Sequence, residues 1–421
     1  MTQIKSSVEA KPIHSAKPPL SFPEFVALMA FMTALTALSI DAMLPALTNI
    51  AHDLGAQGAN AGQLVISLIF LGLSIGQIFY GPLSDNAGRK PAIYVGLAIY
   101  GIGCLLALFA LNFRMMLIGR FLQGIGVAGP RSVSVALVRD QYTGRAMARV
   151  MSFVMTVFIL VPIVAPMLGQ GILLVAHWRG IFALYLLLAL LAGSWFALRQ
   201  PETLAPERRI PFQISRILAA FREVFRNRIA LGYTVMAGLI SGGFVGYLNS
   251  APQIFQTEYG LGAQFPFYFA TLALALGSAS YLNAQLVMRF GMRTLSRWSL
   301  LGLGALSLLF LLPAWLFHGQ PPLWSFMGYL LLGFFAVGIL FGNLNARAME
   351  PLGHIAGVGA AVVGAFSTLL STLLGGLIGQ SYNGTVLPLV GGFALMSILA
   401  LLVMTWAEGQ RVDAPANRGA D

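Results

Sequence analysis

Long apolar runs separated by short polar segments repeat along almost the whole chain. Each run has about the 20 apolar residues that an α-helix needs to cross a bilayer. The first six runs lie near residues 25–47, 61–83, 92–112, 114–138, 147–172 and 178–198. Six more lie near residues 229–251, 265–288, 296–317, 322–345, 354–380 and 385–406. The pattern predicts an all-α polytopic membrane protein with 12 transmembrane helices.

Composition points the same way. Of the 421 residues, 57% are hydrophobic and 9% are charged, and the mean hydropathy is +0.80. Soluble proteins carry roughly 25% charged residues, so a soluble class is excluded. The single cysteine, Cys104, lies inside an apolar run, which rules out an intramolecular disulfide. The five histidines are scattered along the chain, so we expect no metal site.

The basic residues are distributed asymmetrically. The two tails and the even-numbered connections hold 21 of the 25 Lys and Arg residues, whereas the odd-numbered connections hold only Arg114 and Arg179. Basic loops stay in the cytoplasm, so both termini should be cytoplasmic. The net charge of +11 is explained by this orientation, and we expect no nucleic-acid partner.

A basic connector divides the runs into two groups of six. The expected organisation is a cytoplasmic tail (1–24), an N-terminal six-helix bundle (25–198), the connector (199–228), a C-terminal six-helix bundle (229–406) and a second cytoplasmic tail (407–421). Residues 212–228 alternate apolar and basic positions, which favours an amphipathic helix on the inner leaflet. A binding site for a regulatory partner is the alternative for this stretch.

A charged turn between the second and third runs carries the strongest motif. Residues 81–91 read Gly-Pro-Leu-Ser-Asp-Asn-Ala-Gly-Arg-Lys-Pro and place Asp85, Arg89 and Lys90 close together. Such charges belong in water, and Gly88 gives the turn its backbone freedom. The alternative is a generic basic loop carrying one acid. The spacing, which begins at Gly81, resembles the signature loop of the major facilitator superfamily of transporters.

A weak internal repeat of this motif supports two related halves. Met288-Arg-Phe-Gly-Met-Arg293 falls between the eighth and ninth runs, where a second copy of the loop belongs. Gly291 aligns with Gly88, although Met288 replaces the acid. We therefore expect two pseudo-symmetric six-helix halves in a major facilitator fold. Halves of this kind place the substrate site near the midplane between them.

Charges inside the membrane are costly and therefore point to function. Asp41 is the only carboxylate well inside any run, and Arg120 and Arg131 are the only such cations. Asp41 and Arg120 are each six residues from the outer end of their helices, so a facing pair is plausible. Arg131 follows Arg120 by eleven residues, or about 16 Å on the same helix face. Gln123 shares that face, which indicates a polar stripe along a cavity.

Asp41 can take up and release a proton. Burial favours its protonated form, whereas a nearby arginine favours the ionised form. A conformational change that alters either influence would couple protonation to transport. The alternative is a static interhelical pair between Asp41 and Arg120. For Arg131 we favour contact with substrate over a role in helix packing.

Further motifs extend the resemblance. Gly119-Arg-Phe-Leu-Gln-Gly-Ile-Gly126 resembles the fourth-span motif of the superfamily, whose arginine is tied to proton transfer and matches Arg120. Ile40-Asp-Ala-Met-Leu-Pro45 resembles the first-span motif of the twelve-span drug:proton antiporters. The stretch from Pro162 through Pro166 to Gly169 resembles the fifth-span antiporter motif in the form of the bicyclomycin/chloramphenicol-resistance (Bcr/CflA) branch. Met349-Glu-Pro-Leu-Gly-His-Ile-Ala-Gly357 also resembles that branch.

The sequence departs from the branch at a few positions. Arg131 stands where an apolar residue is usual, and this cation could bias the cavity toward anionic substrates. Ala165 and Gln170 replace glycines common in the wider antiporter motif. Ordinary packing of a kinked helix is the alternative for the fifth-span stretch.

The resemblance implies a gate at the signature loop. Asp85 would cap the start of the eleventh span, a favourable place for an anion. Arg89 would pair with Asp140 at the cytoplasmic end of the fourth span. Breaking these contacts would free the cytoplasmic side to open.

Other polar and aromatic residues of the inner spans are candidates for the substrate cavity, each as readily explained by helix packing. They are Phe31, Tyr247, Asn249, Gln253, Asn283, Asn343 and Asn345. An apolar, aromatic lining suits amphipathic molecules.

The sequence thus predicts a monomeric, proton-coupled antiporter of the bacterial inner membrane that exports amphipathic small molecules or drugs. It would need no cofactor, because the proton gradient supplies the driving force. A proton-coupled importer of a natural product, such as a siderophore or peptide-like metabolite, is the alternative, and transport direction distinguishes the two. An enzyme is disfavoured because the sequence shows no nucleophile–base or metal constellation.

Overall fold

The computed structural model describes residues 20–409, which form helices and no strands. In the first part of the chain the helices are α1 (Phe22–Asp41), α2 (Leu47–Asp53), α3 (Leu64–Ala87), α4 (Arg89–Leu108), α5 (Phe113–Gln141), α6 (Gly144–Val175) and α7 (Arg179–Arg199). They are followed by α8 (Ile214–Arg226), α9 (Arg228–Pro252), α10 (Phe265–Leu316), α11 (Leu323–Met349), α12 (Ala356–Gln380) and α13 (Leu387–Glu408). The predicted tails lie mostly outside the described residues.

Short turns complete the described chain. Five of them are 3-10 helices, and they are η1 (Leu44–Ala46), η2 (Ala61–Gln63), η3 (Pro206–Arg208), η5 (Gly262–Gln264) and η6 (Glu350–Ile355). A π-helical turn, η4 (Gln253–Glu258), extends α9. We call the end of the molecule that holds the 81–91 loop and α8 the loop end, and the end that holds η1, η2 and η4 the distal end.

Ten helical segments in the described part of the chain are long and apolar enough to cross a membrane, which makes this a multi-pass helical membrane protein. The twelve separate spans predicted from the apolar runs are not recovered as twelve. Two segments, Gly262–Leu316 with 55 residues and Leu323–Gln380 with 58, far exceed the roughly 20 residues that one crossing needs. The first contains a backbone break in α10, and the second joins α11 to α12 through η6.

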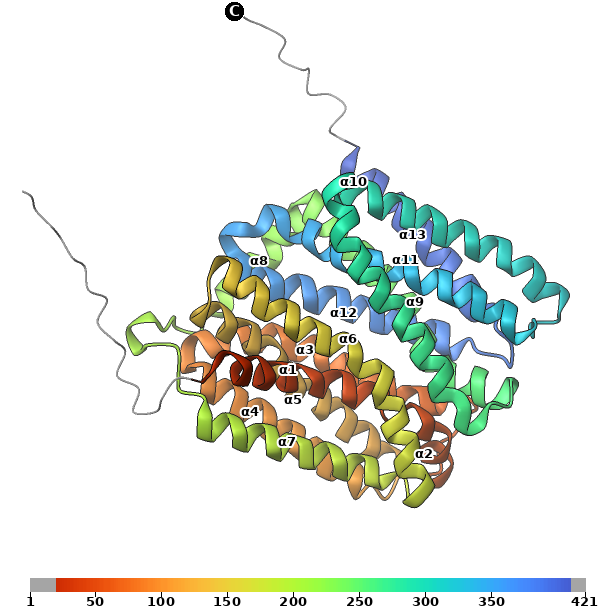
Figure 1. The fold of residues 1–421 in the computed structure, drawn as a ribbon, viewed down its shortest axis with the longest axis horizontal. Coiled ribbons are helices and arrows are strands. Elements are labelled where there is room, and N and C mark those ends of the chain that lie inside the picture. The colour runs from red at the N-terminus through yellow and green to blue at the C-terminus, as the bar shows by residue number, and fades with distance from the viewer. Residues whose placement is uncertain (1–19, 410–421) are drawn as a thin grey trace, which may run out of the picture.

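Positive backbone φ angles mark two related turns. Gly88 has a φ of 109° between α3 and α4, and Gly291 has a φ of 78° where α10 breaks. Glycine adopts this region without the steric penalty of a side chain. The break in α10 therefore falls where the weaker echo of the signature loop was found. Figure 1 shows the two parts of α10 meeting at an angle near its label.

The helices form two groups that lie against each other. In Figure 1 the red to yellow-green helices α1–α7 gather in the lower part of the view, and the green to blue helices α9–α13 gather above them. Helix α3 packs on α12 and α6 packs on α10 across the boundary. Within the first group α5 contacts α3, α4 and α1, so residues on α5 are well placed to face several helices.

Helix α8 is amphipathic, as its alternating pattern indicated. Ile217, Ala220 and Val224 are buried, and the helix contacts α12 and α9. Leu218 and Phe225 remain exposed on the other faces. One apolar side of α8 therefore packs on the protein itself, while other apolar side chains stay free to meet a membrane surface.

Candidate functional site

Arg120 is a fully buried cation on α5 that binds two neighbouring helices. Its Nη2 donates to the Ser39 carbonyl of α1 at 2.7 Å, and its Nε donates to the Val65 carbonyl of α3 at 3.1 Å. Its Nη1 donates to Gln123 Oε1 at 2.5 Å. The ring of Phe182 lies 5.9 Å from the guanidinium carbon. Charged hydrogen bonds of this kind fix α1, α3 and α5 relative to one another.

Asp41 is the last residue of α1 and is only 5% exposed. Within residues 20–409 no ion pair or hydrogen bond joins it to Arg120. The facing pair suggested by their depth is therefore not formed, because the arginine bonds instead to two backbone carbonyls and Gln123. The similar depth itself is seen, since the Ser39 carbonyl that Arg120 binds lies two residues before Asp41.

Several buried polar groups near these helices have no partner. Thr36 Oγ1 on α1, Gln123 Nε2 on α5, Tyr185 OH on α7 and Tyr247 OH on α9 lack hydrogen bonds among the described residues. Tyr185 and Tyr247 lie within electrostatic range of Asp41. An unsatisfied buried group costs roughly 1–3 kcal/mol, so these atoms favour the binding of water or a polar ligand.

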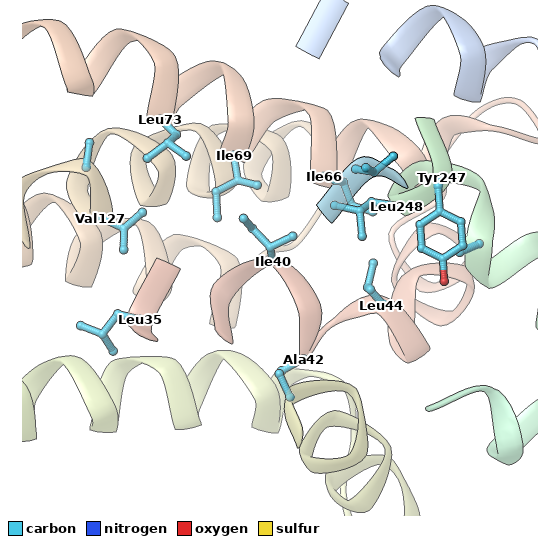
Figure 2. Packing of buried hydrophobic residues seen from close by; sticks show 14 of the residues in the cluster. Leu35, Ile40, Ala42, Leu44, Ile66, Ile69, Leu73, Val127, Tyr247 and Leu248 are labelled. Carbon is cyan, nitrogen blue, oxygen red and sulfur yellow. The ribbon is translucent and has the colours of Figure 1, made fainter. Parts of the chain in front are cut away.

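Tyr247 marks the apolar side of this region. Figure 2 shows it beside Leu248 and close to Leu44 and Ile66, which come from other elements. Its ring also packs on Phe334 with the centroids 4.7 Å apart. The proposed cavity residue thus presents one hydroxyl within a largely hydrophobic surrounding.

Arg131 lies three turns along α5 from Arg120 and is half-buried. Its guanidinium carbon is 5.8 Å from the centroid of the Phe158 ring on α6. No acidic side chain pairs with it in the part of the chain that the structure describes. A cation held over an aromatic ring and without a carboxylate partner can bind an anionic group.

The signature loop forms an ion-pair cluster at the loop end. Arg89 Nε donates to Asp140 Oδ2 at 2.8 Å, its Nη2 donates to Asp140 Oδ1 at 3.3 Å, and its Nη1 donates to Asp85 Oδ1 at 2.5 Å. Arg89 therefore contacts the partner that the resemblance indicated. Asp85 bonds to Arg89, and no hydrogen bond from α12 to Asp85 is found among residues 20–409.

Sequence reasoning missed Glu202, which follows α7. Its carboxylate accepts the backbone N–H groups of Arg89 at 3.0 Å and Lys90 at 2.9 Å, at the first turn of α4. An anion at a helix N-terminus is favourable, so Glu202 stabilises the signature loop at the start of α4. A Cβ at Gly88 would lie 2.7 Å from Glu202 Oε2, whereas one at Gly81 would meet nothing within 4 Å. General capping rules describe such a contact, but nothing in the sequence links positions this far apart.

The remaining cavity candidates fall in different places. Asn283 and Asn343 form a reciprocal amide pair at 2.8 and 3.2 Å between α10 and α11. The ring of Phe31 lies 6.5 Å from that of Trp195 within the first group of helices. Asn345 bonds to its own helix at the Phe341 carbonyl.

Asn249 and Gln253 instead lie at the distal end, between the two groups of helices. Asn249 Nδ2 donates to the Gly375 carbonyl at 3.1 Å, and Gln253 Nε2 donates to the Ala59 carbonyl at 3.0 Å. Both residues line a cavity of about 520 Å³ at this end. Gln63 Nε2 donates to Gln253 Oε1 at 2.5 Å.

Asn60 and Gln380 extend this amide network, and sequence reasoning did not single them out. Asn60 Nδ2 donates to the carbonyls of Gln380 and Tyr382, at 3.0 and 2.8 Å, and Gln380 Nε2 donates to the Asn60 carbonyl at 3.0 Å. The Tyr382 hydroxyl donates to Glu258 at 2.9 Å; burial and then this carboxylate raise its pKa, so the hydroxyl stays a donor. The contacts of Asn60 with the end of α12 are therefore made by neutral amides and carbonyls, unlike the ion pairs of the signature loop.

The fifth-span motif lies in the middle of α6, opposite the end of α1. Pro162 and Pro166 are inside the helix, and Ala165, Pro166 and Gly169 are buried. A Cβ built at Gly169 would lie 1.7 Å from the Ala42 carbonyl oxygen. The motif therefore lets α6 approach the backbone next to Asp41.

This arrangement defines a helical membrane protein with two packed groups of spans and buried charges between helices. The family model described as Major Facilitator Superfamily matches residues 29–376, so the chain belongs to that superfamily. Its members are transporters. The chain is accordingly a membrane transporter of small molecules.

Relatives agree with this assignment. The chain is 31% identical over 392 residues to the "Uncharacterized MFS-type transporter YdgK" of Bacillus subtilis, covering 91% of this chain and 95% of the relative. It is 29% identical over 402 residues to the "Bicyclomycin resistance protein homolog" of Haemophilus influenzae, covering 90% and 96%. The second match confirms the resemblance to the drug:proton antiporter branch predicted from the motifs.

Among solved structures, the xylose transporter XylE from E. coli in a partially occluded inward open conformation is similar. It matches with a TM-score of 0.72 and 15% sequence identity, over 94% of this chain and 99% of that chain. At this identity the likeness shows the fold alone.

Proposed function

We propose that this protein is a proton-coupled antiporter that exports amphipathic small molecules or drugs from the cytoplasm by alternating access. The observation that carries the proposal is Asp41, a carboxylate with 5% exposure at the end of α1 and without a basic partner among residues 20–409. The antibiotic-resistance name of the Haemophilus relative supports the substrate class.

The proposal includes twelve spans in two pseudo-symmetric halves. Each of the two long helical segments, with 55 and 58 residues, has the length for two crossings. The boundaries are those expected from the sequence, with halves at 25–198 and 229–406, a connector at 199–228, and cytoplasmic tails at 1–24 and 407–421. In this arrangement the protein works as a monomer in the bacterial inner membrane, with the basic loop end in the cytoplasm.

The coupling step involves Asp41 and Arg120. In the present arrangement the N–H groups of Arg120 bond to Ser39, Val65 and Gln123, which leaves Asp41 free to hold a proton. A movement of α1 relative to α5 that brings the guanidinium to Asp41 favours release of that proton. Protonation and the rearrangement of these helices are thereby linked.

The two ends act as alternate gates in this cycle. The amide contacts of Asn60, Gln63 and Gln253 close the distal side here. The cluster of Asp85, Arg89 and Asp140 belongs to the opposite side. Substrate enters from the cytoplasm, and proton uptake by Asp41 from outside accompanies its exit.

The test uses purified protein in liposomes with an internal pH dye. A substrate gradient is imposed across a panel that includes amphenicols, bicyclomycin, sulfonamides, cysteine-containing peptides and siderophores. We expect proton movement opposite to the substrate, lost in Asp41→Asn and kept in Asp53→Asn, a carboxylate that lies on α2 and bonds to His177 and Trp178.

Three outcomes separate the alternatives. Proton movement in the same direction as the substrate makes the protein an importer. Coupled transport that survives Asp41→Asn reduces Asp41 to a structural residue. Substrate binding without any proton movement rejects the coupling altogether.

A further inference from the structure

A cavity rich in arginine lies at the loop end, among the second group of helices. It has a volume of about 330 Å³ and is formed where α8 meets α9, beside the end of α13. The charged and capping side chains that line it are Arg226, Asn227, Arg228, Arg293, Arg347 and Glu408. None of them belongs to the coupling or gate residues proposed above.

The one acid in this lining is already engaged. Glu408 pairs with Arg293, accepts the Tyr233 hydroxyl at 2.5 Å and lies 3.9 Å from Arg347. Arg347 also pairs with Glu350. Two of the four arginines are thus neutralised, at least in part, by carboxylates.

The other two arginines carry uncompensated charge. Neither Arg226 nor Arg228 forms an ion pair within residues 20–409. The guanidinium of Arg228 lies over the ring of Trp406, 4.9 Å from its centroid, and its Nε is buried without a hydrogen-bond partner. Arg347 Nε is likewise buried without a hydrogen-bond partner, and the whole residue is only 8% exposed. Buried donors of this kind favour an acceptor-rich ligand.

The backbone adds to the positive potential. Helix α9 begins at Arg228, and its N-terminus faces the same cavity. The side chain of Asn227 satisfies the N–H groups of Ile229 and Ala230 at 3.1 and 3.0 Å. The positive end of the helix dipole therefore coincides with the two unpaired arginines.

Exposed apolar side chains lie near this cavity. Trp406 on α13 is 47% exposed and Phe225 on α8 is 44% exposed. The amphipathic ring of a tryptophan such as Trp406 sits at the level of the lipid headgroups. Basic pockets between spans on the cytoplasmic side bind anionic headgroups.

We infer that this cavity binds a phosphate-bearing anion, with Arg226 and Arg228 as its principal ligands. The phosphate comes either from the headgroup of an anionic phospholipid or from a soluble phosphate. Bound there, it links α8, the start of α9 and the end of α13. If the proposed orientation holds, a lipid ligand comes from the inner leaflet. The binding itself does not depend on the direction of transport.

The test measures binding to the purified full-length protein by the shift of its thermal unfolding. The probes are dihexanoyl phosphatidylglycerol, dihexanoyl phosphatidylcholine and inorganic phosphate. The variant Arg226→Gln/Arg228→Gln removes two charges from the cavity. The control Arg216→Gln/Arg222→Gln removes two charges from exposed positions of α8 that do not line the cavity.

We expect the cavity variant to weaken binding of the anionic probe about thirtyfold, since each arginine near a membrane surface contributes about 1 kcal/mol. The control should weaken binding only about twofold, because its two arginines do not line the cavity. Arg226→Gln alone removes an exposed side chain and should weaken binding about fivefold, which keeps the test valid if the double variant unfolds. These outcomes are independent of proton-coupled export, which is assayed separately.

The probes distinguish the sources. If phosphatidylglycerol saturates the site and millimolar phosphate does not displace it, the ligand is a lipid headgroup. If millimolar phosphate displaces phosphatidylglycerol, the ligand is a soluble anion. Both results support the site. Equal binding of phosphatidylglycerol and phosphatidylcholine, with no response to inorganic phosphate, overturns it. Equal losses in the cavity and control variants do so as well.

Discussion

Asn60 and Gln380 exchange hydrogen bonds across the two groups of helices, although 320 positions separate them in the chain. Each side-chain amide donates to the other residue's backbone carbonyl at 3.0 Å. The Asn60 side chain also donates to Tyr382 and accepts from Gln253. This exchange is the centre of the contacts that hold the distal end together.

Asn60→Ala should weaken the closed distal end. The substitution removes hydrogen bonds to three residues, each contributing about 1 kcal/mol, so the population open at this end should rise at least tenfold. The measurement is the rate at which an impermeant maleimide labels Ser67→Cys, a half-buried position on α3 beneath the contacts. The native Cys104 is fully buried, so background labelling should be low.

The matched control for this experiment is Asn383→Ala. Asn383 lines the distal-end cavity together with Asn60, and within residues 20–409 its side chain accepts only the local hydroxyl of Thr385. Its loss should leave the labelling rate unchanged. Unaltered labelling of Ser67→Cys in Asn60→Ala would mean that the amide contacts do not control access from this end.

Asp85→Asn should slow transport and spare substrate binding. Arg89 keeps Asp140 as a partner, but its 2.5 Å contact with position 85 at the end of α3 changes from an ion pair to a neutral hydrogen bond. Couplings of this type are typically 1–3 kcal/mol, so we expect a loss of about tenfold in transport rate at unchanged affinity. Exposed Glu207→Gln is the control. Full transport by normally inserted Asp85→Asn protein would contradict a role in gating.

Arg131→Gln should reduce the transport of substrates that carry a carboxylate. The cation lies over Phe158 without an acidic partner among the described residues, so it is available to an anionic group. A hydrogen bond to a charged group contributes about 1.5–3 kcal/mol, which predicts a loss of about ten- to a hundredfold in apparent affinity. The neutral amide of the same compound should be much less affected.

The control cation for Arg131 is Arg149. It also lies over aromatic rings, Phe22 at 5.1 Å and Phe153 at 6.0 Å, but it is exposed at the start of α6. Arg149→Gln should leave both substrates unaffected. Equal losses for acid and amide in Arg131→Gln would assign the residue to helix packing.

Much of the fold follows from local pattern. The apolar runs predict the helical membrane protein because each run carries its own signal. The pairing of Arg89 with Asp140 was implied by the resemblance to the superfamily's signature loop, and the structure contains it. Gly88 and Gly291 were aligned from sequence, and both adopt positive φ angles where one helix gives way to the next.

Contacts to backbone atoms are the part that sequence reasoning could not supply. Arg120 bonds to the carbonyls of Ser39 and Val65, and a carbonyl has no residue identity to recognise. The amide of Asn60 likewise binds the carbonyls of Gln380, at the end of α12, and of Tyr382, just beyond it. Depth along a helix placed Asp41 and Arg120 at one level, but it could not specify the direction in which the guanidinium points.

Gly169→Ala should destabilise the protein beside Asp41. A Cβ at this position would lie 1.7 Å from the Ala42 carbonyl oxygen, so α6 must move away from the end of α1. Overpacking of this kind costs about 1–3 kcal/mol.

Gly171→Ala is the matched control, because it adds the same methyl group to the same helix and meets nothing within 4 Å. Thermal unfolding in detergent should separate the two variants, with only Gly169→Ala less stable. Equal stability would show that α1 and α6 can separate at no cost, and close packing there would no longer explain the glycine.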